Sequence, residues 1–164
     1  WTSLSGIGAC RLPSNQIKVR VIFADTDAMG IVYHTNYIRW FEMGRNELMR
    51  QLGLAYTELE KQGLHLPLTE VSCRYLAPAK YDHVVTVETK FDYIRRASIK
   101  FLSRIWTENC EKILVEGHTI HACVNSEGKI RRMPQVILAL AEKYNINRGE
   151  EYGRKAIQER TEKS

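Results

Sequence analysis

The periodicity of the apolar residues changes once along the chain, and this change constrains the fold more than any other feature. Between Tyr37 and Leu52 apolar residues recur every three or four positions, which predicts one long amphipathic helix. From Leu66 onward they alternate every second residue over four segments, as in half-buried strands. Because no long crossover separates these segments, the sequence predicts an α+β protein whose last four strands form an antiparallel meander.

Caps and turn residues give the expected bounds of each element. We expect the long helix to begin at a cap on Thr35 or Asn36, to run to about Arg50 and to stop at Gly53. The other expected elements are a first strand at 17–23, a short helix at 56–62, strands at 68–76, 84–93, 97–106 and 112–124, and a last helix opened by Pro134. The predicted organisation is an N-terminal extension over 1–15, one domain over 16–144 and a charged tail over 145–164.

Composition narrows the class of protein. With 44% apolar and 26% charged residues among 164, the chain is typical of a single soluble globular domain. Its 24 Lys and Arg against 19 Asp and Glu give a net charge of +5, which favours an anionic partner: nucleic acid, a phospholipid surface or a phosphorylated small molecule. Four cysteines without a CxxC pair indicate a reducing compartment, so we expect a cytoplasmic protein.

A polar cluster directly precedes the long helix. It consists of Asp25, Asp27, Tyr33, His34 and Asn36. The free backbone N–H groups at a helix N-terminus bind oxyanions, and a carboxylate beside them can act as a general base or as a nucleophile. The residues alone leave a second interpretation open, in which both aspartates only cap turns and the histidine is an ordinary surface residue.

Other motifs point away from metal and nucleotide chemistry. His118 and His121 have HxxH spacing, but on a strand an offset of three places them on opposite faces, so both are predicted to be structural and no metal site is expected. The chain has no GxGxxG, no GxxxxGK[ST] and no GxSxG segment, which disfavours dinucleotide, P-loop and serine-hydrolase sites.

One segment resembles a known family. Residues 23–42, FADTDAMGIVYHTNYIRWFE, closely resemble the signature of the 4-hydroxybenzoyl-CoA thioesterase-like hotdog family, in particular its YbgC-type acyl-CoA thioesterase branch. The resemblance continues through the RYLAPAKYDH segment and covers about residues 17–134. It implies a hotdog fold, in which an antiparallel β-sheet wraps around a long central α-helix. It also implies dimers or tetramers with active sites between subunits.

The resemblance also implies roles for individual residues. Asp27, not Asp25, matches the catalytic carboxylate, and a backbone N–H near His34 would polarise the thioester carbonyl. The His34 side chain matches a histidine implicated in the YbgC branch. That branch often has a tyrosine where this chain has Phe23, so any catalytic role of that hydroxyl is either absent here or filled by another group, for which Tyr33 is the candidate.

Substrate binding is expected at four further residues. Asn36 is one, and the resemblance suggests that Arg95, Arg96 and Arg132 bind the phosphates of CoA, from a neighbouring subunit if necessary. On the residues alone, the dibasic pairs at strand ends are more typical of solvated turns than of phosphate sites. A CoA ligand accounts for the charge of +5 without a nucleic acid or a membrane.

The predicted function is therefore hydrolysis of an acyl-CoA thioester by a cytoplasmic homotetramer that needs no cofactor, with Asp27 as nucleophile or general base. Two alternatives remain. One is a hotdog enoyl-CoA hydratase or dehydratase, and the other is a non-catalytic module that binds an acyl carrier protein or an envelope complex. Nucleic-acid binding is disfavoured because the basic residues are dispersed among acidic ones, and membrane insertion is not expected.

Overall fold

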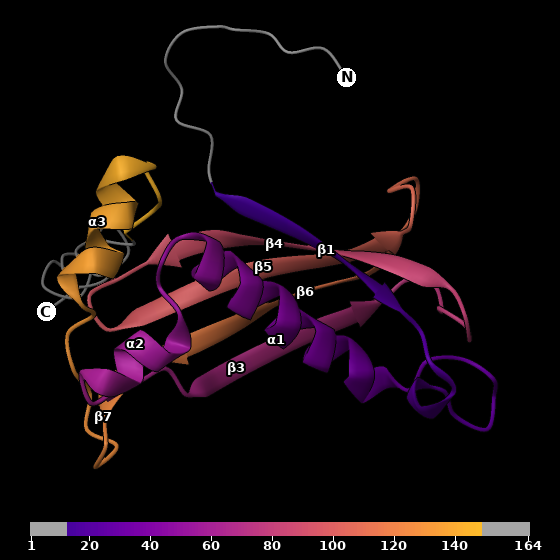
Figure 1. Cartoon of the computed structure of the whole chain (residues 1–164), viewed down its shortest axis with the longest axis horizontal. Coiled ribbons are helices and arrows are strands. Elements are labelled where there is room, and N and C mark those ends of the chain that lie inside the picture. Colours follow the sequence, from indigo (N-terminus) through magenta and orange to yellow (C-terminus); the bar gives the residue numbers. More distant parts are fainter. Residues whose placement is uncertain (1–12, 149–164) are drawn as a thin grey trace, which may run out of the picture.

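A five-stranded antiparallel sheet with a long helix lying across one face forms the body of the protein (Figure 1). The computed structural model describes residues 13–148. Its helices are α1 (His34–Gln51), α2 (Tyr56–Lys61) and α3 (Gln135–Lys143), with a 3-10 turn η1 (Phe23–Asp25). Its strands are β1 (Ser14–Arg20), β2 (Leu64–His65), β3 (Leu68–Tyr75), β4 (Val84–Ile94), β5 (Ser98–Thr107), β6 (Ile113–Ala122) and β7 (Val124–Asn125). The predicted α+β architecture, an antiparallel sheet packed against one long helix, is confirmed.

The strand order differs from the predicted meander. The sheet order is β1-β4-β5-β6-β3, so only β4, β5 and β6 are consecutive neighbours, and β3 pairs with β6 at the far edge. The segment after β3 carries the chain away from that edge: Leu76 and Ala77 donate backbone hydrogen bonds to Leu114, and Val32 donates to Ala79. Alternating residues specify that a segment is a strand but not which strand it pairs with, which is why the meander prediction was wrong for β3.

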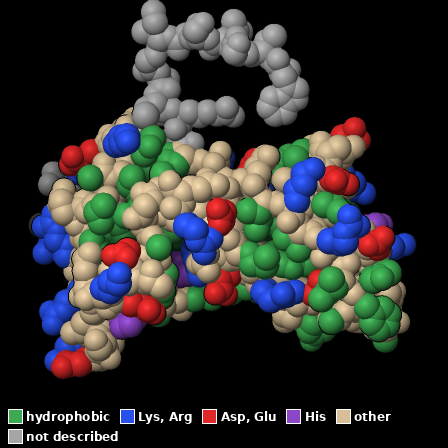
Figure 2. All heavy atoms as spheres, in the orientation of Figure 1, with side chains coloured by type: hydrophobic (Ala, Val, Ile, Leu, Met, Phe, Trp, Pro, Cys, Tyr) green, Lys and Arg blue, Asp and Glu red, His purple; other side chains and the backbone are tan. Residues whose placement is uncertain are grey.

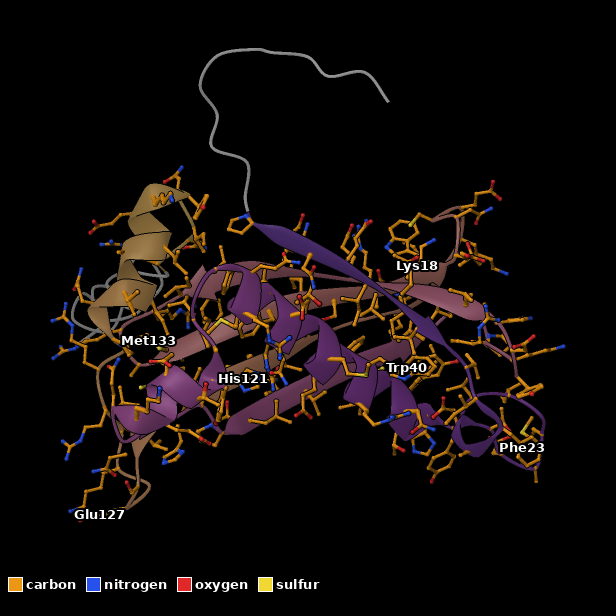
Figure 3. The ribbon with its side chains drawn as sticks, in the orientation of Figure 1. Lys18, Phe23, Trp40, His121, Glu127 and Met133 are labelled. Atoms are coloured by element: carbon orange, nitrogen blue, oxygen red, sulfur yellow. The ribbon has the colours of Figure 1, made fainter. Side chains whose placement is uncertain are left out.

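The predicted apolar face of α1 is buried against the sheet. Tyr37, Trp40, Phe41 and Leu48 lie in the core, and Figure 3 shows Trp40 between the helix and the strands. The helix begins at His34, earlier than expected, and the preceding Tyr33 makes no side-chain cap. Neither proposed cap therefore acts as one, because Thr35 and Asn36 both lie inside the first turn of the helix.

Two glycines allow α1 to approach the sheet. A Cβ on Gly44 would lie 2.4 Å from the Thr89 hydroxyl oxygen, and a Cβ on Gly117 would lie 2.1 Å from the Ser72 carbonyl oxygen and 2.9 Å from the Phe41 ring. These separations are shorter than van der Waals contact. Any larger residue would force α1 away from the sheet and displace the loop at its N-terminus.

The ends of the domain extend beyond the expected limits. Strand β1 starts at Ser14, and the buried Asn15 amide donates to the Gly44 carbonyl oxygen and accepts from Gln51, so residues before 16 belong to the sheet. Ile146 is buried in the core, so packing continues past residue 144. Cys10 and most of the expected charged tail lie outside the described residues. None of the helices within 13–148 has the length and hydrophobicity needed to span a bilayer.

Candidate active site

The loop between β1 and α1 holds the two aspartates in different environments. Asp25 is buried, with 4% of its surface exposed. Its carboxylate accepts a hydrogen bond from Arg39 at 2.5 Å and another from the Ile22 backbone at 3.1 Å. Its carbonyl oxygen accepts from the Tyr33 backbone at 2.8 Å. Asp25 therefore organises the loop and is not free to react with a ligand.

Asp27 presents its carboxylate to a pocket. One oxygen accepts a hydrogen bond from the Met29 backbone at 2.8 Å, and the other has no hydrogen-bond partner among residues 13–148. The backbone of Asp27 is fixed by hydrogen bonds to Ile31 and Gly30, the latter in a left-handed conformation (φ 75°) that suits glycine. The loop thus orients one carboxylate oxygen and leaves it accessible.

The pocket lies between the N-terminus of α1 and the end of β3. Its volume is about 350 Å³. It is lined by Asp27, Ile31, Val32, His34, Tyr37, Tyr75, Leu76, Ala77 and Pro78. One carboxylate and one imidazole among mainly apolar and aromatic groups is the usual composition of a small-molecule site.

The first turn of α1 supplies hydrogen-bond donors at this pocket. In the described part of the chain, the backbone N–H groups of His34 and Thr35 donate to no protein acceptor, as expected of a helix start. These groups and the helix dipole favour an oxyanion placed near His34. A carboxylate and an oxyanion-binding helix end therefore face the same volume.

Two tyrosines hold the pocket wall in place. The Tyr75 hydroxyl donates to the His34 carbonyl oxygen at 2.9 Å, and the Tyr37 hydroxyl accepts from the Ala79 backbone at 3.1 Å. Burial raises the pKa of Tyr75 to about 12 and also raises the pKa of Tyr37, so both hydroxyls stay protonated at neutral pH. The two residues join β3 and the following segment to the start of α1.

Two predicted site residues near the start of α1, Asn36 and Tyr33, lie outside this pocket, and so does Phe23. The Asn36 amide donates to the Asp25 carbonyl oxygen at 2.9 Å, so it supports the loop. The Tyr33 ring packs on the His34 ring with centroids 4.3 Å apart and is not part of the pocket lining. Phe23 is 79% exposed, contacts Tyr81 edge-on, and lies on the loop at the end of the molecule far from α3 (Figure 3).

Comparison with known proteins decides the family. The family model described as the thioesterase-like superfamily matches residues 21–140, which is most of the chain. The chain belongs to the thioesterase-like superfamily. This membership confirms the expected hotdog family and the assignment to the thioester hydrolases.

Relatives within this superfamily include acyl-CoA thioesterases. The chain is 32% identical over 123 residues to the acyl-CoA thioester hydrolase YbgC of Escherichia coli, covering 74% of this chain and 90% of the relative. It is 39% identical over 88 residues to the acyl-CoA thioesterase YbgC of Haemophilus influenzae, covering 53% and 65% respectively. A crystal structure of DHNA-CoA thioesterase from Staphylococcus aureus superposes with a TM-score of 0.73 at 28% identity, covering 80% of this chain and 89% of that one.

The predicted phosphate-binding arginines of this thioesterase-like protein form a separate cluster. Arg95, Arg96 and Arg132 line a cavity of about 460 Å³ together with Arg148. The cluster lies beside α3 and the β4–β5 connection, at the opposite end of the molecule from the Asp27 loop (Figure 1). Since the 18 residues of α1 alone span about 27 Å, one subunit does not bring the cluster to its own Asp27.

The two histidines of the HxxH segment lie on opposite faces of β6, as predicted. His118 is on the solvent face, 2.8 Å from Glu70, whereas His121 is buried on the face that packs under α1. No cluster of three His, Cys, Asp or Glu side chains suited to a metal occurs within the described residues.

Tyr75 is the pocket residue that the sequence analysis missed as a functional candidate. It belongs to the RYLAPAKYDH segment, whose resemblance to the family points to no single residue of that segment. Its contact with His34 joins residues 41 positions apart, and residue spacing carries no signal for such a contact.

Proposed function

We propose that this protein hydrolyses acyl-CoA thioesters at the Asp27 pocket. The observation that carries the proposal is that Asp27, with one carboxylate oxygen unpaired in the described chain, and His34, the first residue of α1, line the same pocket. The names of the YbgC relatives support the same activity.

The proposed chemistry needs one oxyanion site and one carboxylate. The substrate carbonyl oxygen lies near the His34 backbone N–H, and a donor placed there stabilises the tetrahedral oxyanion by about 3–4 kcal/mol. In one route, Asp27 takes a proton from a water whose oxygen attacks the carbonyl carbon. In the other, Asp27 itself attacks to form a mixed anhydride, which water then hydrolyses. In both routes the carbon–sulfur bond breaks and CoA leaves as a thiolate that becomes protonated.

A second subunit completes the proposed site. All but one of the residues of the edge strand β3 are exposed, including the apolar Leu68 and Val71, and its outer backbone groups are unpaired in the described chain. Such an edge is a template for pairing with another strand. We place a two-fold dimer contact along β3, because Tyr75 at the end of this strand is also part of the pocket wall.

The dimer also accounts for the distant arginines. In this dimer the two-fold axis passes near the middle of β3. The α3 end of the partner subunit then lies toward the Asp27 end of the first subunit. Basic side chains gather at that α3 side in Figure 2. We propose that Arg95, Arg96 and Arg132 of one subunit bind CoA phosphates of a substrate whose thioester lies in the pocket of the other. Higher assembly into a tetramer is a further expectation.

Product analysis tests the activity. Purified protein is incubated with a panel of acyl-CoAs, an enoyl-CoA and an acyl carrier protein thioester, and the products are followed as free thiol and by mass spectrometry. We expect stoichiometric free acid and CoA. Hydration of the enoyl-CoA without thiol release, or tight binding of every thioester without turnover, would show that the protein is a hydratase or a binding module. Analytical ultracentrifugation under assay conditions tests the dimer, and a fully active monomer contradicts it.

A further inference from the structure

A second pocket lies under the C-terminal half of α1 and has no role in the function proposed above. Its volume is about 220 Å³, and its walls combine the apolar Met49, Leu66 and Phe101 with the polar Arg45 and His121. Figure 3 shows His121 beneath α1, close to α2. The lining also includes Ala55 and the polar Asn46, Arg50, Tyr56 and Thr57, so apolar and polar side chains share the walls, a composition suited to a ligand that has both an apolar part and a polar end.

The hydrogen bonds of His121 define its protonation. Its Nδ1 lies 3.0 Å from the Leu66 carbonyl oxygen, which can only accept, so Nδ1 carries the proton. Nε2 is then an acceptor, 2.8 Å from the Arg45 guanidinium and 3.0 Å from the Thr119 hydroxyl. Burial, together with the nearby positive charge of Arg45, lowers the pKa of His121 to about 4, so the ring is neutral at physiological pH. Arg45 therefore supplies the only charge of this pair.

Arg45 has no ion-pair partner in the described chain, and the carboxylate of Glu42, one turn earlier on α1, acts on it only at longer range. Its side chain is partly buried, and no Asp or Glu oxygen of residues 13–148 lies within 4.0 Å of it. By contrast, the neighbouring Arg39 and Arg50 on the same helix are paired with Asp25 and Glu47. A guanidinium has five donors, and only one of those of Arg45 is used by His121. The remaining donors suit a carboxylate, which guanidinium groups bind in a bidentate geometry.

The strand that forms the proposed dimer contact brings this pocket to the reacting group of the other subunit. Strand β3 runs from Leu68, which pairs with His121, to Tyr75, which lines the Asp27 pocket. When two copies of β3 pair antiparallel about a two-fold axis, the Tyr75 end of one meets the Leu68 end of the other. The Asp27 pocket of each subunit then lies beside the Arg45 pocket of its partner, on the same face of the joined sheet.

We infer that the Arg45–His121 pocket receives the far end of the acyl group, and that the preferred substrates carry a carboxylate at that end. The inference rests on the proposed thioesterase function and names its substrate class: CoA thioesters of dicarboxylic acids linked through one carboxyl group. Met49, Leu66 and Phe101 contact the methylene chain, and Arg45 binds the terminal carboxylate. The neutral His121 positions the Arg45 guanidinium and carries no charge of its own.

A matched substrate series tests this inference. The kcat/KM is measured for succinyl-, glutaryl-, adipoyl- and suberoyl-CoA and for the unsubstituted acyl-CoA of each length. We expect at least one carboxyacyl-CoA to exceed its unsubstituted counterpart by about tenfold or more. In Arg45→Gln that advantage should disappear while the unsubstituted substrates change less than about twofold, and Arg45→Lys should retain part of it. Arg104→Gln, which removes the same charge from the opposite face of the sheet, is the control.

Each possible failure has its own meaning. If wild type hydrolyses both series equally, or if Arg45→Gln lowers both equally in a protein with wild-type circular dichroism, the inference is overturned while the thioesterase function stands. If no thioester is hydrolysed, calorimetric titration with free adipate and hexanoate still tests the pocket. Binding of adipate alone, lost in Arg45→Gln, supports a dicarboxylate site, and equal or absent binding of both acids contradicts it.

Discussion

Replacing Asp25 with Ala tests the structural role of this aspartate and compares it with Asp27, the proposed catalytic one. The Asp25 side chain is 6% exposed, whereas that of its partner Arg39 is 53% exposed. The substitution removes two hydrogen bonds to a charged acceptor, from Arg39 at 2.5 Å and from the Ile22 backbone at 3.1 Å. The corresponding change at Asp27 removes a single exposed hydrogen bond from Met29.

These contacts set the size of the effect. Hydrogen bonds to charged groups contribute about 1.5–3 kcal/mol each to stability. The lower end applies here, because the half-exposed Arg39 regains water once its partner is removed and solvent screens the pair. We therefore expect Asp25→Ala to lower the free energy of unfolding by about 2–3 kcal/mol, and Asp27→Ala to lower it by about 1 kcal/mol or less.

Urea denaturation followed by circular dichroism measures both changes. With slopes of about 1–3 kcal/mol/M for small proteins, Asp25→Ala should shift the midpoint down by about 0.7–3 M, with little shift for Asp27→Ala. Equal midpoint shifts in the two variants, or an unshifted midpoint for Asp25→Ala, would refute the assignment of a purely structural role to Asp25.

Three other predictions concern the remaining polar groups. Tyr75→Phe should lower kcat about three- to tenfold with KM nearly unchanged, because it frees the His34 carbonyl, and a normal kcat contradicts this. The pKa of His121 is about 4 in the folded state and 6.5 in the unfolded state, so the unfolded state binds the proton first as the pH falls. The free energy of unfolding therefore decreases as the pH drops from about 6.5 to 4. Urea midpoints measured across that range should converge with those of His121→Gln at the low-pH end. Neutralising Arg95 and Arg96 should raise KM for acyl-CoA more than for a short thioester without the nucleotide, and an equal rise would show no phosphate contact.

The elements of this fold could be predicted because their burial is periodic. Val85, Val87 and Phe91 lie on the predicted buried face of β4, and the predicted apolar positions of α1 face the sheet. The position of β3 could not be predicted, since its alternation is compatible with either β4 or β6 as a neighbour. Pairing is determined by the path of the segment after β3, which depends on tertiary hydrogen bonds.

The site was predictable in part. The residues between β1 and α1 identified the polar loop, but the spacing of Asp25 and Asp27 does not distinguish them, because both could cap turns. In the structure the two aspartates differ because Arg39, 14 positions after Asp25, binds Asp25 and not Asp27. Arg45 and His121 are 76 positions apart, so their contact has no local signature in the sequence.

The rate of CoA release by Asp27→Asn tests the central claim most directly. Asparagine preserves the size of the side chain and the acceptor for the Met29 backbone, but it can neither take a proton from water nor attack the carbonyl. With saturating acyl-CoA at neutral pH, we predict a kcat about 100- to 10,000-fold below wild type in a protein of unchanged stability. Thiol release within about threefold of wild type would contradict a catalytic role for Asp27.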